Sequence, residues 1–195
     1  MTLYVPGQLF AYVRIGDSDI PLSSSQDQFI CVRDNVKQIL PTVEIFLPDF
    51  NNVLSGKTLI SDGTKIDVAI GDGMGTKIPV KSFTSFGTPK RAPTSTGTYL
   101  HIIGILDGCA DLVRASVSKS INKTSYEVMS DTAGIFGLNF KSNVTSTNDR
   151  MAWRGGRQHW GNFLNFVADH GYAQPGSFMS VAIQSDNTLF YNDVA

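Results

Sequence analysis

The sequence predicts an α+β fold that is rich in β-strands. Through the first half of the chain, apolar residues come in short runs separated by turn residues, which is typical of strands. The 18 glycines and 8 prolines favour turns over long helices. Helical spacing of apolar residues appears only later in the chain. With 42% hydrophobic residues, the 195-residue chain can bury a core without disulfides or metals.

The strand pattern can be followed along the first half of the sequence. Strands are expected at 9–15, 29–33, 43–47, 65–70, 82–87, 99–106 and 111–121, with a glycine-rich loop at 71–77 and an exposed connection at 89–97. Asp62 and Gly63 tolerate a positive φ and separate 57–60 from 65–70. This pattern predicts a hairpin around the two turn residues.

The pattern becomes helical near residue 122. Thr124 and Glu127 have the spacing of a capping box, and Gly137 is a suitable stop for the helix that they begin. A second helix is expected at 157–170 with Gly171 after it, followed by a closing hairpin of 177–184 and 188–191. The chain is therefore expected to contain a β domain, residues 1–121, and an ααββ unit, residues 122–195.

Charge and cysteine content exclude several classes of protein. The 16 Lys and Arg residues nearly cancel the 17 Asp and Glu residues, and a net charge of -1 provides no general attraction for nucleic acid or anionic membranes. Cys31 and Cys109 lie in apolar runs, which predicts two buried or half-buried thiols. A secretory signal and a membrane-spanning run are not expected. We therefore expect a protein that folds in a reducing cytoplasm.

Motifs for cofactors and metals fail on their details. The loop 71–75 lacks the third glycine of a dinucleotide site, and 55–58 resembles the end of a P-loop without its leading glycine. His101, His159 and His170 are spaced too far apart in the sequence to share a metal as an i, i+4 pair would. No cofactor and no metal site are expected.

The sequence also lacks the patterns that activate catalytic residues. Neither cysteine follows a pattern that would activate it, and no serine lies in a Gly-x-Ser-x-Gly elbow. Asp17 with Asp19, and Asp107 with Asp111, are carboxylate pairs, but aspartate is common in turns such as these. We expect a protein that is not an enzyme.

Arginine and tryptophan gather before the second helix. These candidate interface residues are Arg150, Trp153, Arg154, Arg157 and Trp160. Arginine and tryptophan are the residue types that most often anchor interfaces, and both can also stack on bases or sugars. The segment is therefore interpreted as a packing or intersubunit surface, with a polymer-binding surface as the alternative.

The order of six segments supplies a family resemblance. The segments are Phe29–Val36, Leu40–Asp49, Ser61–Ile66, Tyr99–Gly104, Ser118–Met129 and Trp160–Tyr172. The first four resemble the tube-like β-barrel or sandwich domain of baseplate hub proteins from contractile-tailed bacteriophages and related contractile injection systems. The last two resemble the helical insertion that follows this domain.

The resemblance implies a structural protein of the virion, located in the tail baseplate and assembled in the cytoplasm of the host bacterium. It implies a homotrimer whose β domains build a ring between the tail tube and the central spike, with no membrane insertion and no specific nucleic acid. Hub proteins usually carry a second barrel, so this chain is expected to be short or split, with a strand edge completed by a partner. The alternative is a tail module that binds or hydrolyses peptidoglycan.

Overall fold

The computed structural model describes residues 10–20, 29–34, 39–49, 60–71, 80–94 and 97–195. It divides the chain into two compact units. Unit 1 comprises Met1–Val32 and Thr42–Asp107, and unit 2 comprises Arg33–Pro41 and Gly108–Ala195. Among the described residues, no helix has both the length and the apolar character needed to cross a membrane.

Unit 1 is built from one sheet. Its strands are β1 (Phe10–Ile15), β2 (Ser18–Ile20), β3 (Phe29–Arg33), β4 (Thr42–Pro48), β5 (Lys65–Gly71), β6 (Lys81–Ser85), β7 (Lys90–Thr94) and β8 (Gly97–Leu106). They are hydrogen-bonded in the order β2-β1-β5-β6-β8-β4-β3, and β7 pairs with β8 beside this path. Among the described strands β2 and β3 remain the two ends of the sheet, which is therefore open rather than closed into a barrel.

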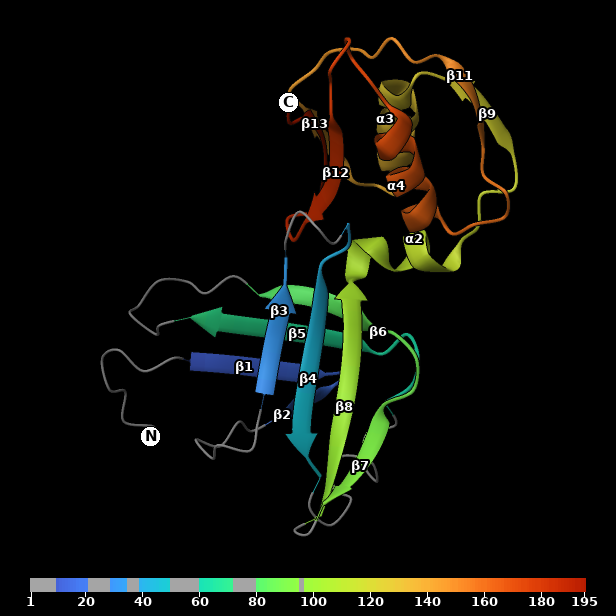
Figure 1. Ribbon diagram of the computed structural model, residues 1–195. Coiled ribbons are helices and arrows are strands. Elements are labelled where there is room, and N and C mark those ends of the chain that lie inside the picture. Colours follow the sequence, from blue (N-terminus) through green and yellow to red (C-terminus); the bar gives the residue numbers. More distant parts are fainter. Residues whose placement is uncertain (1–9, 21–28, 35–38, 50–59, 72–79, 95–96) are drawn as a thin grey trace. The chain divides into compact units, whose positions relative to one another are not determined.

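The core of unit 1 lies between two layers of this sheet. Val43, Ile45 and Leu47 alternate along β4 and are fully buried, whereas the intervening Phe46 is half-buried on the outer face. Figure 1 shows β1 and β5 crossing β3, β4 and β8, as in a sandwich with crossed layers. On β8, a Cβ atom at Gly104 would lie 2.8 Å from Val43 Cγ1, so the packing requires glycine at this position.

Two expectations for unit 1 are corrected or limited by the structure. The connection expected at 89–97 contains β7, because Pro93 is tolerated on a strand that pairs on one side only. The turn at Asp62 and Gly63 is confirmed, but the described partners of β5 are β1 and β6. Residues 57–59 and 72–77 of the expected hairpin and glycine loop lie outside the described residues.

Unit 2 combines helices with two small sheets. Its elements are the short 3-10 helix η2 (Asp107–Cys109, shared at the boundary), α2 (Ala110–Arg114), β9 (Ser120–Lys123), α3 (Ser125–Ile135), β10 (Asn139–Ser142), β11 (Met151–Arg154), α4 (Trp160–His170), β12 (Met179–Gln184) and β13 (Thr188–Asp193). The helices α3 and α4 pack on the sheet β10-β13-β12, and β9 and β11 form a two-stranded ribbon against the helices (Figure 1). The predicted α+β, β-rich fold class is confirmed.

The strand expected at 111–121 is wrong. Ala110–Arg114 is a helix whose Leu112 is fully buried, and this helix packs on α4. A short apolar run is compatible with a strand or a helix. Here the run is helical because it packs on α4. The two compact units adjoin in the chain at Asp107–Gly108, and the domain boundary expected at 121–122 remains a prediction. That either unit folds independently remains a proposal.

The ααββ order expected for the C-terminal part is incomplete. Between the helices lie β10, which runs parallel to β13, and β11, which pairs with β9. The second helix starts at Trp160 instead of 157, because Arg157 has a φ of 63° and cannot join a helix. The first helix, its capping box and the closing hairpin are confirmed.

Candidate interaction surfaces

A row of rings crosses the outer face of β3, β4 and β8. Phe46 stacks on His101 with centroids 4.2 Å apart and planes within 7°, and Phe29 meets Phe46 edge-on at 5.8 Å. Phe46 and His101 meet because they are opposite each other in the register of β4 and β8. We call Phe29, Phe46 and His101 the aromatic row. Phe29, 50% exposed on the outermost strand, leaves the row open at the edge of the sheet.

A carboxylate holds the histidine of this row. Glu44 Oε1 lies 2.8 Å from His101 Nε2, and both side chains are about one-fifth exposed. The pair is ionic only when His101 is protonated. With a proton on Nε2 the ring donates to Glu44, and this hydrogen bond fixes the imidazole plane against Phe46. His101 is thus a positioned surface group.

The outer face of β1, β5 and β6 is polar instead. The Tyr12 hydroxyl donates to Asp19 over 2.6 Å, and the Ser82 hydroxyl donates to Asp67 over 2.6 Å. The hydrogen bond to Asp19 stabilises the protonated phenol and raises the pKa of Tyr12. Because its polar groups are satisfied by one another, this face has the character of a solvated surface. The aromatic row is therefore the stronger candidate interface of unit 1.

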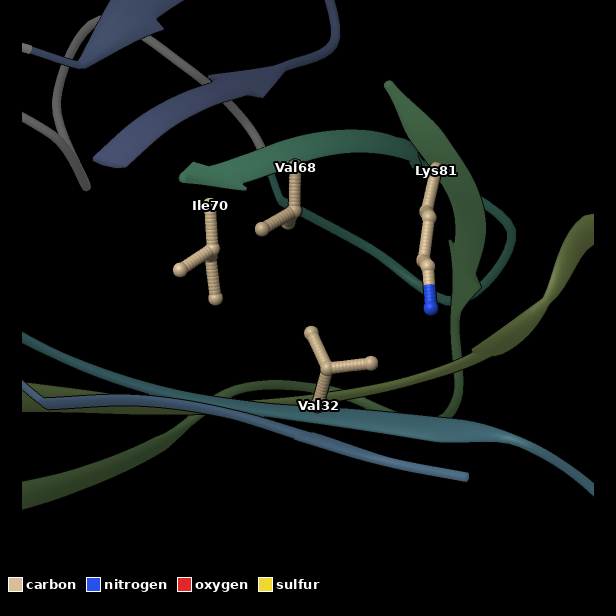
Figure 2. Close-up of a pocket in the computed structure, with 4 residues that line it drawn as sticks. All are labelled: Val32, Val68, Ile70 and Lys81. Carbon is tan, nitrogen blue, oxygen red and sulfur yellow. The ribbon is translucent and has the colours of Figure 1, made fainter. Parts of the chain in front are cut away.

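A small hollow opens between the layers of unit 1. Figure 2 shows Val32 of β3 facing Val68 and Ile70 of β5, with the Lys81 side chain at one side. The hollow has a volume of about 130 Å³, whereas pockets for small molecules hold roughly 300 Å³ or more. It is better explained as the open end of the apolar core than as a substrate site.

The structure separates the tryptophans of unit 2 from the arginines near them. Trp153 is 1% exposed, its Nε1 donates to the Lys123 carbonyl over 2.7 Å, and its ring meets Phe166 edge-on. Trp160 is half-buried and packs edge-on against Phe136 and Phe163. Both tryptophans therefore belong to the interior packing of the unit. The sequence carries no local signal for the burial of Trp153, because it depends on the pairing of β11 with β9.

The three arginines of the segment are all exposed. Arg150 Nη1 lies 3.9 Å from Glu127 Oε2, a distance at which a surface ion pair contributes little. Arg154 points away from the face of β11 that carries Trp153, because adjacent strand residues alternate. Arg157 sits in a tight turn with a left-handed backbone. That the segment forms an interface remains a prediction. Of its five candidate residues, the three arginines are the exposed ones.

A buried acid that sequence reasoning missed organises the start of α3. Asp149, 2% exposed, accepts hydrogen bonds from the Ser125 amide and hydroxyl, the Thr147 hydroxyl and the Tyr172 amide. Tyr191 extends the network by donating to Ser125 Oγ over 2.7 Å, and burial raises the pKa of Tyr191 to about 12. Because these groups are sealed from solvent and satisfied internally, the network is structural rather than a reaction site.

Other residues singled out for chemistry have structural surroundings. Burial raises the pKa of the Cys109 thiol to about 12, which opposes formation of a reactive thiolate. Asp107 accepts from the Thr84 hydroxyl, and Asp111 lies in the first turn of α2. His170 Nδ1 is 2.8 Å from the Phe166 carbonyl. Within the described ranges, no group of three or more potential ligand side chains could hold a metal ion.

Comparison of the sequence with family models and with curated proteins finds no match. Comparison of the structure with solved structures does find matches. A 43 kDa tail protein of prophage MuSo2 from Shewanella oneidensis matches over 94% of this chain with a TM-score of 0.60 and 15% identity. A tail protein from Neisseria meningitidis MC58 matches over 94% with a TM-score of 0.59 and 15% identity. The chain has the fold of these tail proteins.

The same fold occurs in a Francisella PdpA-VgrG complex, matched over 96% of this chain with a TM-score of 0.55 and 11% identity. The predicted resemblance to proteins of contractile tails and injection systems is thus confirmed as a likeness of fold. This chain spans about half the length of the two tail proteins, covering 53% and 51% of them, and 32% of the Francisella chain.

Proposed function

We propose that this chain is a structural component of a phage-type tail, located in the baseplate hub and without a catalytic role. The observation that carries the proposal is the match of nearly the whole chain to two tail proteins, which includes both units rather than one common domain. In this proposal the chain forms a homotrimer that joins the tail tube to the spike.

The surfaces of unit 1 support an assembly role. Within the described sheet, β3 pairs with β4 only, and in this proposal its second edge accepts a strand of another polypeptide. Beside this edge lies the aromatic row, with Phe29 half exposed. A strand edge next to the half-exposed ring of Phe29 offers both directional hydrogen bonds and apolar contact, which are the components of a specific interface.

The proposal is tested by the oligomeric state and its dependence on Phe29. We expect the purified chain to form a trimer in multi-angle light scattering at micromolar concentration, and Phe29→Glu to dissociate it without lowering the melting temperature of the monomer. Lys65→Gln, on the polar face and with the same change in charge, serves as the control. Antibodies against the chain should label the baseplate end of intact tails. A stable monomer together with labelling elsewhere on the particle would refute the proposal.

A further inference from the structure

Three exposed cations lie on neighbouring backbone segments at one end of the β9–β11 ribbon. Arg154 is paired in register with Ser120, next to Lys119. The backbone of Arg157 bonds to Val117, two residues before Lys119. We call Lys119, Arg154 and Arg157 the basic cluster. None of the three side chains forms an ion pair or hydrogen bond with a residue that the structure describes, so their charges are available to a ligand.

The turn that carries Arg157 is rigidly held. The Arg157 amide donates to the Val117 carbonyl over 3.1 Å, and the Val117 amide donates to the Gln158 carbonyl over 2.9 Å. At Gly155 a Cβ atom would lie 2.3 Å from Val117 Cγ1, so the two segments are in close contact. Arg157 adopts a φ of 63°, a conformation for which glycine or asparagine is better suited. The fold therefore presents an arginine on a fixed backbone, which reduces the entropy lost on binding.

The outer face of the ribbon supplies neutral hydrogen-bonding groups beside the cations. Ser120 and Asn122 of β9 are exposed and lie on the face that carries Arg154, because they are paired with Arg154 and Ala152 in the register of β9 and β11. Ser116 and Ser118, which precede the ribbon, are exposed as well. Hydroxyl, amide and guanidinium groups on one side of the ribbon can donate to several oxygens of an extended anionic chain.

The number of cations favours carboxylates of a protein over the phosphates of nucleic acid. The affinity of a protein for a nucleic-acid backbone rises with the number of phosphates that it neutralises, and three cations would release only about three counterions, which gives weak binding. The net charge of the chain, -1, adds no long-range attraction. Arginine pairs with a carboxylate through two parallel hydrogen bonds, so a few such pairs suffice for a specific contact with a protein.

We propose that the basic cluster binds a carboxylate-rich segment of a partner polypeptide. The inference rests on the proposed assembly role for its biological setting, because a structural tail component functions by binding other proteins. It assigns to unit 2 a contact of its own, separate from the strand edge of unit 1.

The test is binding of the full chain to a labelled polyglutamate peptide, followed by fluorescence anisotropy at low salt. A neutral Gly-Ser peptide of the same length and a single-stranded DNA oligonucleotide are the comparison probes. We expect binding of polyglutamate that weakens about tenfold or more in Arg154→Gln/Arg157→Asn, since each charge-assisted pair is worth roughly a factor of ten. Asparagine tolerates the left-handed backbone at 157, and Arg154→Gln alone covers the case in which the double variant unfolds.

Lys90→Gln/Arg91→Gln is the matched control, because it removes two exposed cations from unit 1 and should leave the affinity unchanged. Equal loss in this control, or equal binding of the neutral peptide, would overturn the proposal. DNA binding that is as tight as peptide binding and depends on the same arginines would assign the surface to nucleic acid instead. Neither result would change the trimer measured by light scattering or the antibody labelling of tails. Failure of this inference can therefore be distinguished from failure of the proposed function.

Discussion

Asp149 illustrates how one residue can determine the local structure of a unit. The first amides of a helix have no partners within the helix, and here Asp149 accepts from Ser125, Thr147 from Tyr126, and Thr124 from Glu127. Each donor at the start of α3 is therefore bonded to a side chain. The same carboxylate also binds the Tyr172 amide and so connects the segment after α4 to the start of α3.

Replacing Asp149 with alanine is expected to destabilise unit 2 strongly. The change leaves three buried donors and the part-buried Tyr172 amide without their acceptor, and we expect the free energy of unfolding to fall by about 3 kcal/mol. Urea unfolding followed by tryptophan fluorescence measures this, since both tryptophans lie in unit 2. Asp169→Ala, at an exposed position of α4, should change stability by only a few tenths of a kcal/mol. Similar losses in the two variants would contradict the role assigned to Asp149.

At the scale of the helices, two glycines should respond in opposite ways to alanine. Gly134 lies on α3 with open space around its position, so Gly134→Ala should stabilise the protein by about 0.5 to 1 kcal/mol through helix propensity. Gly171 ends α4 where a Cβ atom would lie 2.3 Å from the Tyr191 hydroxyl oxygen and 2.9 Å from Ser125 Oγ. Gly171→Ala should therefore destabilise by about 2 kcal/mol. Thermal melts of both variants would show the difference, and a shift of the same sign in both would count against it.

The capping box of α3 should give a measurable dependence on pH. The Thr124 amide donates to Glu127 over 2.8 Å and lowers the pKa of that carboxyl below its ordinary value of 4.5. Because the folded-state pKa is lower than the unfolded one, the stabilisation is complete above pH 4.5 and is lost as the pH falls through the folded-state pKa. The stability difference between wild type and Glu127→Gln should shrink over this acidic range. A difference that stays constant with pH would exclude a contribution from the ionised carboxylate.

At the scale of the whole molecule, the division of the chain is open to a direct test. Unit 2 includes α2, whose buried Leu112 packs in the unit, as well as the segment Arg33–Pro41, whose Ile39 carbonyl accepts from the Ile183 amide. We expect a fragment of residues 108–195 to unfold cooperatively, and a fragment of 122–195 to lose cooperativity and bind a dye specific for exposed apolar surface. Equal stability of the two fragments would favour a boundary at 121–122.

Sequence reasoning was most successful where local chemistry decides. The capping box at Thr124, the turn at Asp62 and Gly63, and the alternating strand β4 were predictable, because each depends on residues close in the chain. Of the Arg/Trp segment, the residue types were visible but the direction of each side chain was not. Trp153 is a core residue because β11 pairs with β9, about thirty positions earlier in the chain. The sequence of neither segment alone predicts that pairing.

Thus the sequence by itself determined the β-rich α+β class, most of the strands, the two long helices and the resemblance to tail proteins. Only the tertiary structure decided that 110–114 is helical, that β10 runs parallel to β13, and that Asp149 is the common acceptor of a buried network. The physical reason is the range of the interactions. Turns and caps are decided by neighbouring residues, whereas a short apolar run or a lone aspartate takes its role from partners that are distant in sequence.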